Sequence, residues 1–296
     1  MKRNMLVLLG LAVLASAVAS AGPFGTAAED YLSQVRVKKF PAAMQCWTYR
    51  RYSFFEAVEK TKALGIKYLQ AYPGQPLAAE DRNDGFGHEQ TEAQVEAVRK
   101  KLADAGMEVV GYGVVDIGRT EAEMRKAFEF ARKLGIQVIA TEPQDADFPV
   151  LDKLVKEYDV RIALHNHPEP SRYWNPQTVL DACQGLSPRV GACADTGHWM
   201  RSGVTPLDGI KLLQGRIVTF HFKDLNEMGK DAHDVPWGTG KGDIPAVLRR
   251  LKQQGFKGVF SAEYEHNWEK NTEDIAACVR NFEAMARVVP DRRAAA

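Results

Sequence analysis

Residues 120–142 have the sequence TEAEMRKAFEFARKLGIQVIATE, and this stretch contains one complete structural unit. Thr120 and Glu123 form a capping box, the pattern that begins many helices, and apolar residues then recur with helical spacing. Gly135 follows, at the place where a glycine often ends a helix. The next residues, 136–141, are rich in branched aliphatic side chains, as in a strand buried on both faces. The stretch therefore predicts a helix, a tight turn and a buried strand.

The same succession recurs along the chain from residue 39 to residue 288. Eight short apolar runs are predicted to be strands: 41–47, 66–72, 107–115, 136–141, 159–165, 189–195, 216–222 and 257–263. Strands that alternate with helices run parallel, and eight such units in about 250 residues are typical of a closed (β/α)8 barrel, or TIM barrel. We therefore predict an α/β fold with a single barrel domain. The alternative is an open, doubly wound sheet in two lobes.

The composition is that of a globular protein, with 296 residues of which 45% are hydrophobic and 26% charged. The chain has 39 Lys and Arg against 38 Asp and Glu, a net charge of +1 at pH 7. This balance provides no basic surface of the kind that binds nucleic acid, so we expect no nucleic-acid partner. Barrels often pair through their outer helices, and a homo-oligomer is therefore an open alternative to a monomer.

Residues 1–21 have the features of a secretory signal peptide. Lys2 and Arg3 precede an apolar run over residues 5–18, and Ala19-Ser20-Ala21 matches an Ala-x-Ala cleavage site. The apolar run is shorter than the roughly 20 residues that a membrane-spanning helix needs. We therefore expect an exported protein, periplasmic or secreted, with no stable membrane association. The rest of the chain divides into a lead-in segment, the barrel and a flexible tail: 22–38, 39–288 and 289–296.

Four cysteines remain after this cleavage: Cys46, Cys183, Cys193 and Cys278. No two of them form a C-x-x-C pair, and four cysteines in a chain of this length do not make a disulfide scaffold. We interpret them mainly as small core residues. The sequence leaves their pairing open.

The active site of such a barrel lies at the carboxyl ends of its strands. Four residues with ionisable side chains end predicted strands there: Glu142, Asp195, His221 and Glu263. Each follows an apolar run that leads into the barrel core, where an unpaired carboxylate is costly, so converging acids need a cation or a shared proton. Three carboxylates and one imidazole suit one divalent metal ion, Mn²⁺ foremost, with Co²⁺, Mg²⁺ or Zn²⁺ as alternatives. The competing interpretation is a set of ion pairs with Lys223 and nearby arginines.

The histidines support a functional site at this end of the barrel. All seven lie at strand ends or in the loops that follow, and none lies in a predicted helix: His88, His165, His167, His198, His221, His233 and His266. Residues two apart on a strand share a face, so His165 and His167 point the same way, as do His221 and Lys223. A histidine that binds metal also needs a partner for its second ring nitrogen.

Together these residues resemble the xylose isomerase-like TIM-barrel superfamily, which includes sugar phosphate isomerases and epimerases and also endonuclease IV. The resemblance covers residues 39–288, and the motifs that carry it are Thr141-Glu142-Pro143, His165-Asn166-His167, Asp195-Thr196-Gly197-His198, His221-Phe222-Lys223-Asp224, the loop 235–240 with Asp243, and Glu263. It implies that the metal ligands are Glu142, Asp195, His221 and Glu263. It also implies that Glu142 and Glu263 are the catalytic pair that moves a proton on the substrate.

The resemblance further implies that His198 contacts a substrate oxygen. The other candidate substrate-binding residues are His167, Lys223, Trp47, Tyr112 and Trp237, and for each aromatic residue the alternative is core packing. Tyr72 and Tyr112 replace histidines that endonuclease IV carries, which argues against a DNA-repair site. Glu227 stands where ketohexose epimerases carry an arginine, which argues against a simple free-ketose epimerase.

Three functions remain open at this point. The first is an exported, divalent-metal-dependent sugar isomerase or epimerase that abstracts a proton α to a carbonyl through a glutamate pair and an enediolate. The second is a carbon–oxygen lyase or hydratase that acts on 3-keto-glycosides or keto-inositols by β-elimination after the same first step. The third is a non-catalytic carbohydrate-binding protein. In all three the partner is a small carbohydrate.

Overall fold

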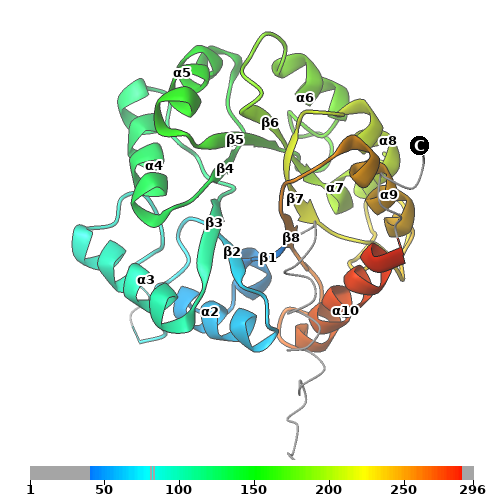
Figure 1. Cartoon of the computed structure of the whole chain (residues 1–296), viewed down its shortest axis with the longest axis horizontal. Coiled ribbons are helices and arrows are strands. Elements are labelled where there is room, and N and C mark those ends of the chain that lie inside the picture. Colours follow the sequence, from blue (N-terminus) through cyan, green and yellow to red (C-terminus); the bar gives the residue numbers. More distant parts are fainter. Residues whose placement is uncertain (1–40, 81, 83, 289–296) are drawn as a thin grey trace, which may run out of the picture.

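Eight parallel strands close into a barrel in the part of the chain that the computed structural model describes, residues 41–80, 82 and 84–288 (Figure 1). The strands are β1 (Ala42–Gln45), β2 (Tyr68–Ala71), β3 (Glu108–Tyr112), β4 (Val138–Thr141), β5 (Arg161–His165), β6 (Val190–Asp195), β7 (Ile217–Phe222) and β8 (Phe260–Ala262). They follow one another in chain order, and β1 pairs with β8 through the register Ala42 to Phe260. This closure confirms the predicted TIM barrel and excludes the open doubly wound sheet.

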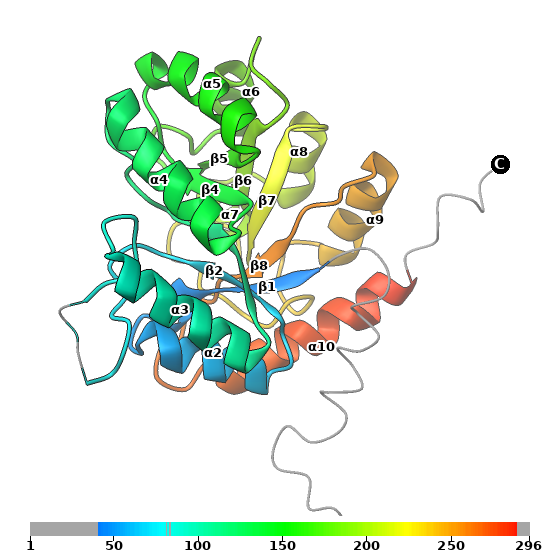
Figure 2. The same ribbon diagram turned by 60° about the vertical axis from the view of Figure 1, so that its left-hand side comes forward.

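Helices surround the barrel and cover its outer surface (Figures 1 and 2). They are α2 (Phe54–Ala63), α3 (Glu92–Ala105), α4 (Glu121–Leu134), α5 (Phe148–Tyr158), α6 (Pro176–Ala182), α7 (Thr196–Arg201), α8 (Pro206–Leu212), α9 (Ile244–Gln254) and α10 (Thr272–Val288). Two 3-10 turns, η1 (Cys46–Tyr49) and η2 (Asp145–Asp147), lie just after β1 and β4. No helix in the described ranges is long and apolar enough to cross a membrane.

The ends of several helices are fixed by the residues that the sequence indicates. Thr91 and Thr120 form capping boxes with the residues three positions later, at the starts of α3 and α4. Asn175 and Thr205 cap α6 and α8, and in both a proline takes the first helical position. Gly135 ends α4 with a φ of 72°, a left-handed conformation that a glycine adopts without strain. These local signals separate the strands and so define the repeating unit.

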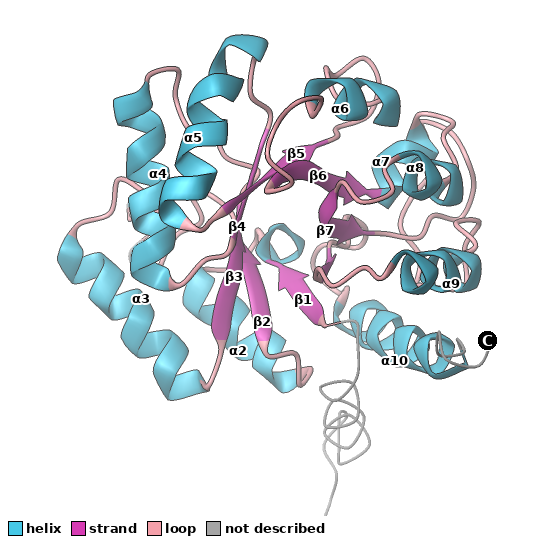
Figure 3. Ribbon diagram, turned by 45° about the horizontal axis from the view of Figure 1, so that its top comes forward, coloured by secondary structure: helices cyan, strands magenta, loops and turns pink. Residues whose placement is uncertain are grey.

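Figure 3 shows the helices outside the ring of strands, and the main hydrophobic core is formed by buried residues of both. Around β7 and β8 it is largely aromatic: the rings of Phe220 and Phe260 stack with their centroids 4.9 Å apart, and Phe222 packs edge-on against Trp237 and Phe282. Offset and edge-to-face aromatic pairs of this kind add to the free energy of burial. The carboxyl ends of β7 and β8 are therefore held by a rigid apolar base.

All four cysteines are buried and unpaired. This confirms their interpretation as core residues. One expectation about the histidines is wrong, because His198 lies inside α7, which begins directly after β6. The reason is local: the carboxylate of Asp195 accepts a hydrogen bond from the backbone N–H of His198 at 2.7 Å and caps the helix.

Three predicted segments lie outside the described residues: the signal peptide 1–21, the lead-in 22–38 and the tail 289–296.

Candidate active site

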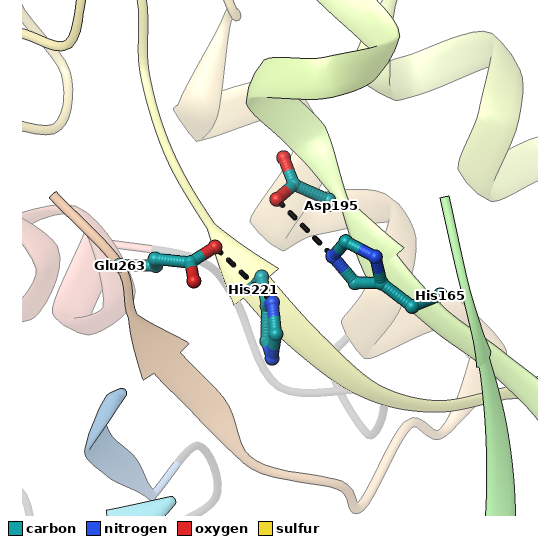
Figure 4. Close-up of side chains that lie close together, drawn as sticks. All are labelled: His165, Asp195, His221 and Glu263. Atoms are coloured by element: carbon teal, nitrogen blue, oxygen red, sulfur yellow. Dashed lines mark ion pairs between the residues drawn. The ribbon is translucent and has the colours of Figure 1, made fainter. Parts of the chain in front are cut away.

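Four buried side chains converge at the carboxyl end of the barrel, from four consecutive strands: His165 on β5, Asp195 on β6, His221 on β7 and Glu263 just after β8 (Figure 4). One ligand atom from each lies within 4.8 Å of those of the other three. All four residues are at most 6% exposed. The structure therefore brings together three of the four predicted metal ligands, with His165 as the fourth member of the group.

The predicted ligand Glu142 belongs to a second group at the same mouth. Its Oε1 accepts a hydrogen bond from Nδ1 of His165 at 3.2 Å and is also paired with Nδ1 of His167. Burial alone raises the pKa of Glu142, but the hydrogen bonds and charges of the two histidines outweigh it and lower the pKa to about 2. His165 therefore lies between the two groups and contacts a carboxylate of each.

His221 is held at both ring nitrogens. Its Nε2 lies 2.7 Å from the amide nitrogen of Gln70 and 3.1 Å from that of Gln45, and amide nitrogens only donate, so Nε2 is an acceptor here. Its Nδ1 faces Oε2 of Glu263 at 3.1 Å. Burial, the main cause, lowers the pKa of His221. The ring is therefore neutral at pH 7.

The ammonium group of Lys223 lies at the centre of the carboxylates. Its Nζ is 2.6 Å from Oδ2 of Asp195, 2.5 Å from Oε2 of Glu263 and 3.0 Å from Oε2 of Glu265, and the side chain is fully buried. Burial lowers the pKa of Lys223, but these carboxylates outweigh it and raise the pKa well above its usual range. The predicted substrate-binding Lys223 is thus engaged by acidic side chains.

His198 is held in one neutral form by Arg201. A guanidinium nitrogen of Arg201, which can only donate, lies 3.1 Å from Nδ1 of His198, so the ring proton is on Nε2. That nitrogen faces Oδ2 of Asp195 at 3.5 Å. Burial is the main reason why the pKa of His198 lies well below its usual value. The predicted substrate contact His198 therefore presents an N–H donor at the mouth.

The loop after β7 is fixed by the carboxylate of Asp224. It accepts hydrogen bonds from the backbone N–H groups of Gly238, Gly240 and Gly242 at 2.8–2.9 Å. A Cβ added at Gly240 would lie 2.3 Å from the carbonyl oxygen of Leu225, so the loop approaches too closely for any side chain. This contact fixes the segment that directly follows Lys223.

The predicted aromatic contacts occupy three different environments. Trp47 is half-buried at the rim, where the guanidinium of Arg50 lies 5.0 Å from its ring centroid. Tyr112 is buried, and its hydroxyl group is 3.0 Å from Nδ1 of His88. Trp237 is 1% exposed, and its indole N–H donates to the carbonyl of Phe222, so the structure places this residue in the core behind β7.

Sequence reasoning did not single out Gln45, Gln70, Arg201 or Glu265. A signal for the two glutamines exists, because each is a polar residue near the end of an otherwise apolar strand. Arg201 and Glu265 follow strand ends by several residues and have no comparable sequence signal. Their roles depend on side-chain contacts that only the fold creates.

A divalent metal ion fits the group of four. Nε2 of His165 and Nδ1 of His221 are buried, and each faces a carboxylate, Asp195 at 3.6 Å and Glu263 at 3.1 Å. Imidazole and carboxylate donors together suit first-row divalent ions. For Nδ1 of His221 to bind a cation, its proton must move to Nε2. Reversal of the Gln70 carboxamide provides the acceptor, because the Ser261 hydroxyl that now donates to Gln70 can equally accept. The Gln45 amide, which now also donates to His221, would then keep only its hydrogen bond to the carbonyl of Gly113.

Comparison with known proteins assigns the chain to a family. Residues 58–282 match the family model described as xylose isomerase-like TIM barrel. The "Probable L-ribulose-5-phosphate 3-epimerase UlaE" of Mycoplasma pneumoniae is 30% identical over 148 residues, 43% of this chain and 46% of that protein. The match thus spans about half the length of the curated relatives.

Two solved structures share the barrel over most of their length. One is an uncharacterized protein from Parabacteroides distasonis, with 31% identity and a TM-score of 0.66 over 82% of this chain and 97% of that chain. The other is described as the "probable 3-DHS dehydratase AsbF" of Bacillus anthracis, with 15% identity and a TM-score of 0.60 over 82% of this chain and 98% of that chain. At 15% identity, the second structure shows a similarity of fold alone.

Proposed function

Because the chain belongs to the xylose isomerase-like TIM barrel family, we propose that it is a divalent-metal-dependent sugar isomerase or epimerase. The observation that carries this proposal is the pair of buried imidazole nitrogens, on His165 and His221, that face the buried carboxylates of Asp195 and Glu263 at 3.6 and 3.1 Å. We expect Mn²⁺ as the ion, with Co²⁺, Mg²⁺ or Zn²⁺ as alternatives. Such an ion would polarise the carbonyl and the neighbouring hydroxyl of a bound sugar.

The chain supplies the base for the proton transfer. Glu142 is ionised at neutral pH and its side chain is 25% exposed, so a substrate in the mouth can reach it. It would take the proton from the carbon next to the carbonyl, and the C–H electron pair then forms the double bond of an enediolate. Return of a proton to the opposite face gives the epimer, and return to the adjacent carbon gives the isomer. We assign Glu263 as the second member of this acid–base pair.

The neighbouring side chains orient the substrate oxygens. Nε2–H of His198 faces Asp195 at 3.5 Å and would donate to a hydroxyl or to the developing oxyanion of a substrate bound beside it. Lys223 keeps Asp195 and Glu263 charged, because its ammonium group contacts both carboxylates. The partner that this arrangement suits is a small sugar with a carbonyl group.

The test is turnover in D₂O followed by NMR, with the metal-loaded protein and a panel of ketoses, ketose phosphates and 3-keto-glycosides. Deuterium incorporated at one carbon without loss of a substituent supports isomerisation or epimerisation. Release of an aglycone or of water identifies the carbon–oxygen lyase instead, since it shares the first proton abstraction. Sugar binding without turnover or deuterium exchange identifies the carbohydrate-binding protein. Glu263→Gln is the inactive control.

We also propose that the protein is exported, on the evidence of residues 1–21 alone. N-terminal sequencing of the full-length gene product recovered from the periplasm or medium should find a chain that starts at Gly22. A chain that retains Met1 and stays in the cytosol contradicts export.

A further inference from the structure

We infer that Arg50, whose guanidinium contacts the indole rings of Trp47 and Trp268 at one side of the barrel mouth, binds an oxyanion group of the substrate, either a phosphate ester or a carboxylate. The inference rests on the proposed function and adds a substrate class to it, an anionic sugar. Trp47 is already a candidate substrate contact, whereas Arg50 and Trp268 have no role in the site described above.

The guanidinium of Arg50 is held by aromatic rings. Its Cζ lies 3.9 Å from the ring centroid of Trp268 and 5.0 Å from that of Trp47, both within the range of a cation–π contact. Trp47 in turn packs edge-on against Tyr72, with the ring centroids 5.0 Å apart. All four side chains are partly exposed. A cation–π contact uses none of the five N–H donors of a guanidinium in a hydrogen bond, so these donors remain available to a ligand.

No acidic side chain neutralises Arg50 within residues 41–80, 82 and 84–288. Its nitrogens form no ion pair and no side-chain hydrogen bond with these residues. Two other cations near the mouth differ from it, because Lys223 and Arg201 each contact at least two carboxylates. The fork of an arginine matches the paired oxygens of a carboxylate or a phosphate. An anionic group on the substrate would therefore complete the contacts of Arg50.

Trp47 and Tyr72 are connected to the candidate metal group through two glutamines. The amide nitrogens of Gln45 and Gln70 lie 3.1 and 2.7 Å from Nε2 of His221. Trp47 and Tyr72 follow these glutamines by two residues, and the backbone N–H of Trp47 donates to Oε1 of Gln45 at 3.1 Å. Two residues of a strand span about 7 Å, a distance that one sugar molecule bridges. A sugar whose carbonyl lies at the metal group would thus reach the aromatic rings with its far end.

Buried hydrogen bonds of Thr48 fix the turn after β1 against the loop after β8. The Thr48 hydroxyl donates to the carbonyl of Ala262 at 3.3 Å and accepts from the backbone N–H of Tyr264 at 3.0 Å. The Thr48 carbonyl accepts from the amide of Asn271 at 3.2 Å. Because Thr48 and Asn271 are at most 2% exposed, these contacts preform the site, and a ligand loses less free energy in ordering it.

The local charge at this side of the mouth is positive. Burial raises the pKa of Tyr72 to about 12, and the positive charges of Arg50 and Arg82 act on it in the opposite direction. Two guanidinium groups, which stay charged over the whole ordinary pH range, therefore act on the Tyr72 hydroxyl. Such a field favours the approach of an anionic substrate over that of a neutral one.

The experiment measures binding to the full-length, metal-loaded protein by titration calorimetry. The probes lack a carbonyl group, so the proposed reaction cannot consume them: xylitol is compared with xylitol 5-phosphate, and methyl glucoside with methyl glucuronide. We expect the anionic member of at least one pair to bind about 10–100-fold more tightly, the usual contribution of charge-assisted hydrogen bonds. The pair that shows the preference distinguishes phosphate from carboxylate. If neither pair shows it, whether both members bind equally or neither binds, the inference is overturned.

Variants of Arg50 assign the preference to this residue. Arg50→Gln should abolish it, change affinity for the neutral probe less than about threefold and leave the far-UV circular dichroism unchanged. Arg50→Lys should keep only part of it, because an ammonium group lacks the fork. Arg51→Gln, a change of the same type at the exposed neighbouring arginine, is the matched control and should keep all of it.

A preference that survives in Arg50→Gln, as for an anion bound directly to the metal, overturns the inference. If the preference depends on Arg50 and no sugar is turned over in D₂O, only the proposed function fails.

Discussion

The two halves of the barrel mouth neutralise their carboxylates in different ways. In the half formed by β6 to β8, Asp195 and Glu263 are buried against the ammonium group of Lys223, whose side chain is 0% exposed. In the half formed by β4 and β5, Glu142 is 25% exposed and its partners are imidazoles, one of them the 49% exposed His167. The carboxylates of the buried half are thus paired with a lysine ammonium group, and the carboxylate of the open half with two imidazoles.

This difference indicates a division of roles. A buried lysine surrounded by carboxylates stays charged, so it keeps the acids of its half ionised whatever enters the mouth. Glu142 is partly exposed, so the half that contains it is suited to proton transfer with a bound substrate. The following predictions test whether the two halves are separable.

The largest expected effect is on turnover. Glu142→Gln should lower kcat by about 10²–10⁴-fold, the usual contribution of a general base, while the protein still binds metal at saturating concentration. Glu263→Gln should lose both turnover and metal. Steady-state kinetics together with metal analysis of the purified variants separates the two. A Glu142→Gln enzyme with the wild-type kcat would show that the open half does not carry the proton.

The second largest effect is expected on stability, from removal of the ammonium group of Lys223. Lys223→Met leaves two buried carboxylates without their partner and should destabilise the metal-free protein by about 3–5 kcal/mol in urea denaturation. Co²⁺ at 100 times its dissociation constant should restore about 2.7 kcal/mol, because it binds the folded state alone. Lys241→Met, a change of the same type at an exposed residue, should stay within about 0.5 kcal/mol. Equal stability of the two variants would contradict the role of Lys223.

A smaller effect is expected from the glycine loop. The Cβ of Gly240→Ala would lie 2.5 Å from Oδ1 of Asp224, so the variant should lose about 1–3 kcal/mol of stability. It should also weaken metal binding, since Asp224 directly follows Lys223. Gly106, at the end of α3, has a left-handed backbone conformation but open space around it. Gly106→Ala should therefore lose about 1–2 kcal/mol of stability through backbone strain alone. Unlike Gly240→Ala, it should leave metal affinity unchanged.

The smallest effect is expected on the reactivity of the four buried cysteines. Burial raises the pKa of Cys183 to about 11 and that of Cys193, two residues before Asp195, well above its usual value. Thiolate, the reactive form, is therefore scarce at pH 8. A thiol reagent such as DTNB should label the native protein very slowly at this pH and all four cysteines after unfolding in guanidinium. Fast labelling of the native protein would mean that the mouth opens more than its burial indicates.

Much of the fold was predictable because its signals are local. All eight strands lie within the predicted ranges, since alternating apolar runs, caps and terminal glycines each depend on only a few neighbouring residues. The strand ends also identified Asp195, His221 and Glu263 as one group, because parallel strands bring their carboxyl ends to one edge.

The details of the site were not predictable in the same way. Glu142 and His165 both end strands, and nothing in the sequence shows which side chain turns inward. The central position of Lys223 depends on three carboxylates from two other strand ends. Trp237 lies in the glycine loop and was a candidate for substrate binding, but its ring packs in the core against Phe222. These outcomes depend on side-chain packing between segments distant in sequence.

The pairing of β1 with β8 has a consequence for when the protein folds during its synthesis. Gln45, from the first strand, contacts His221, which is 176 residues later in the chain, and Glu263 beside it directly follows the last strand. During synthesis, no growing chain that lacks β8 has either the closed ring or its complete set of ligands. Contacts over such separations form late, because the closure of a long loop is slow. The chemistry of this protein should therefore be absent from every nascent fragment and arise in a single final step.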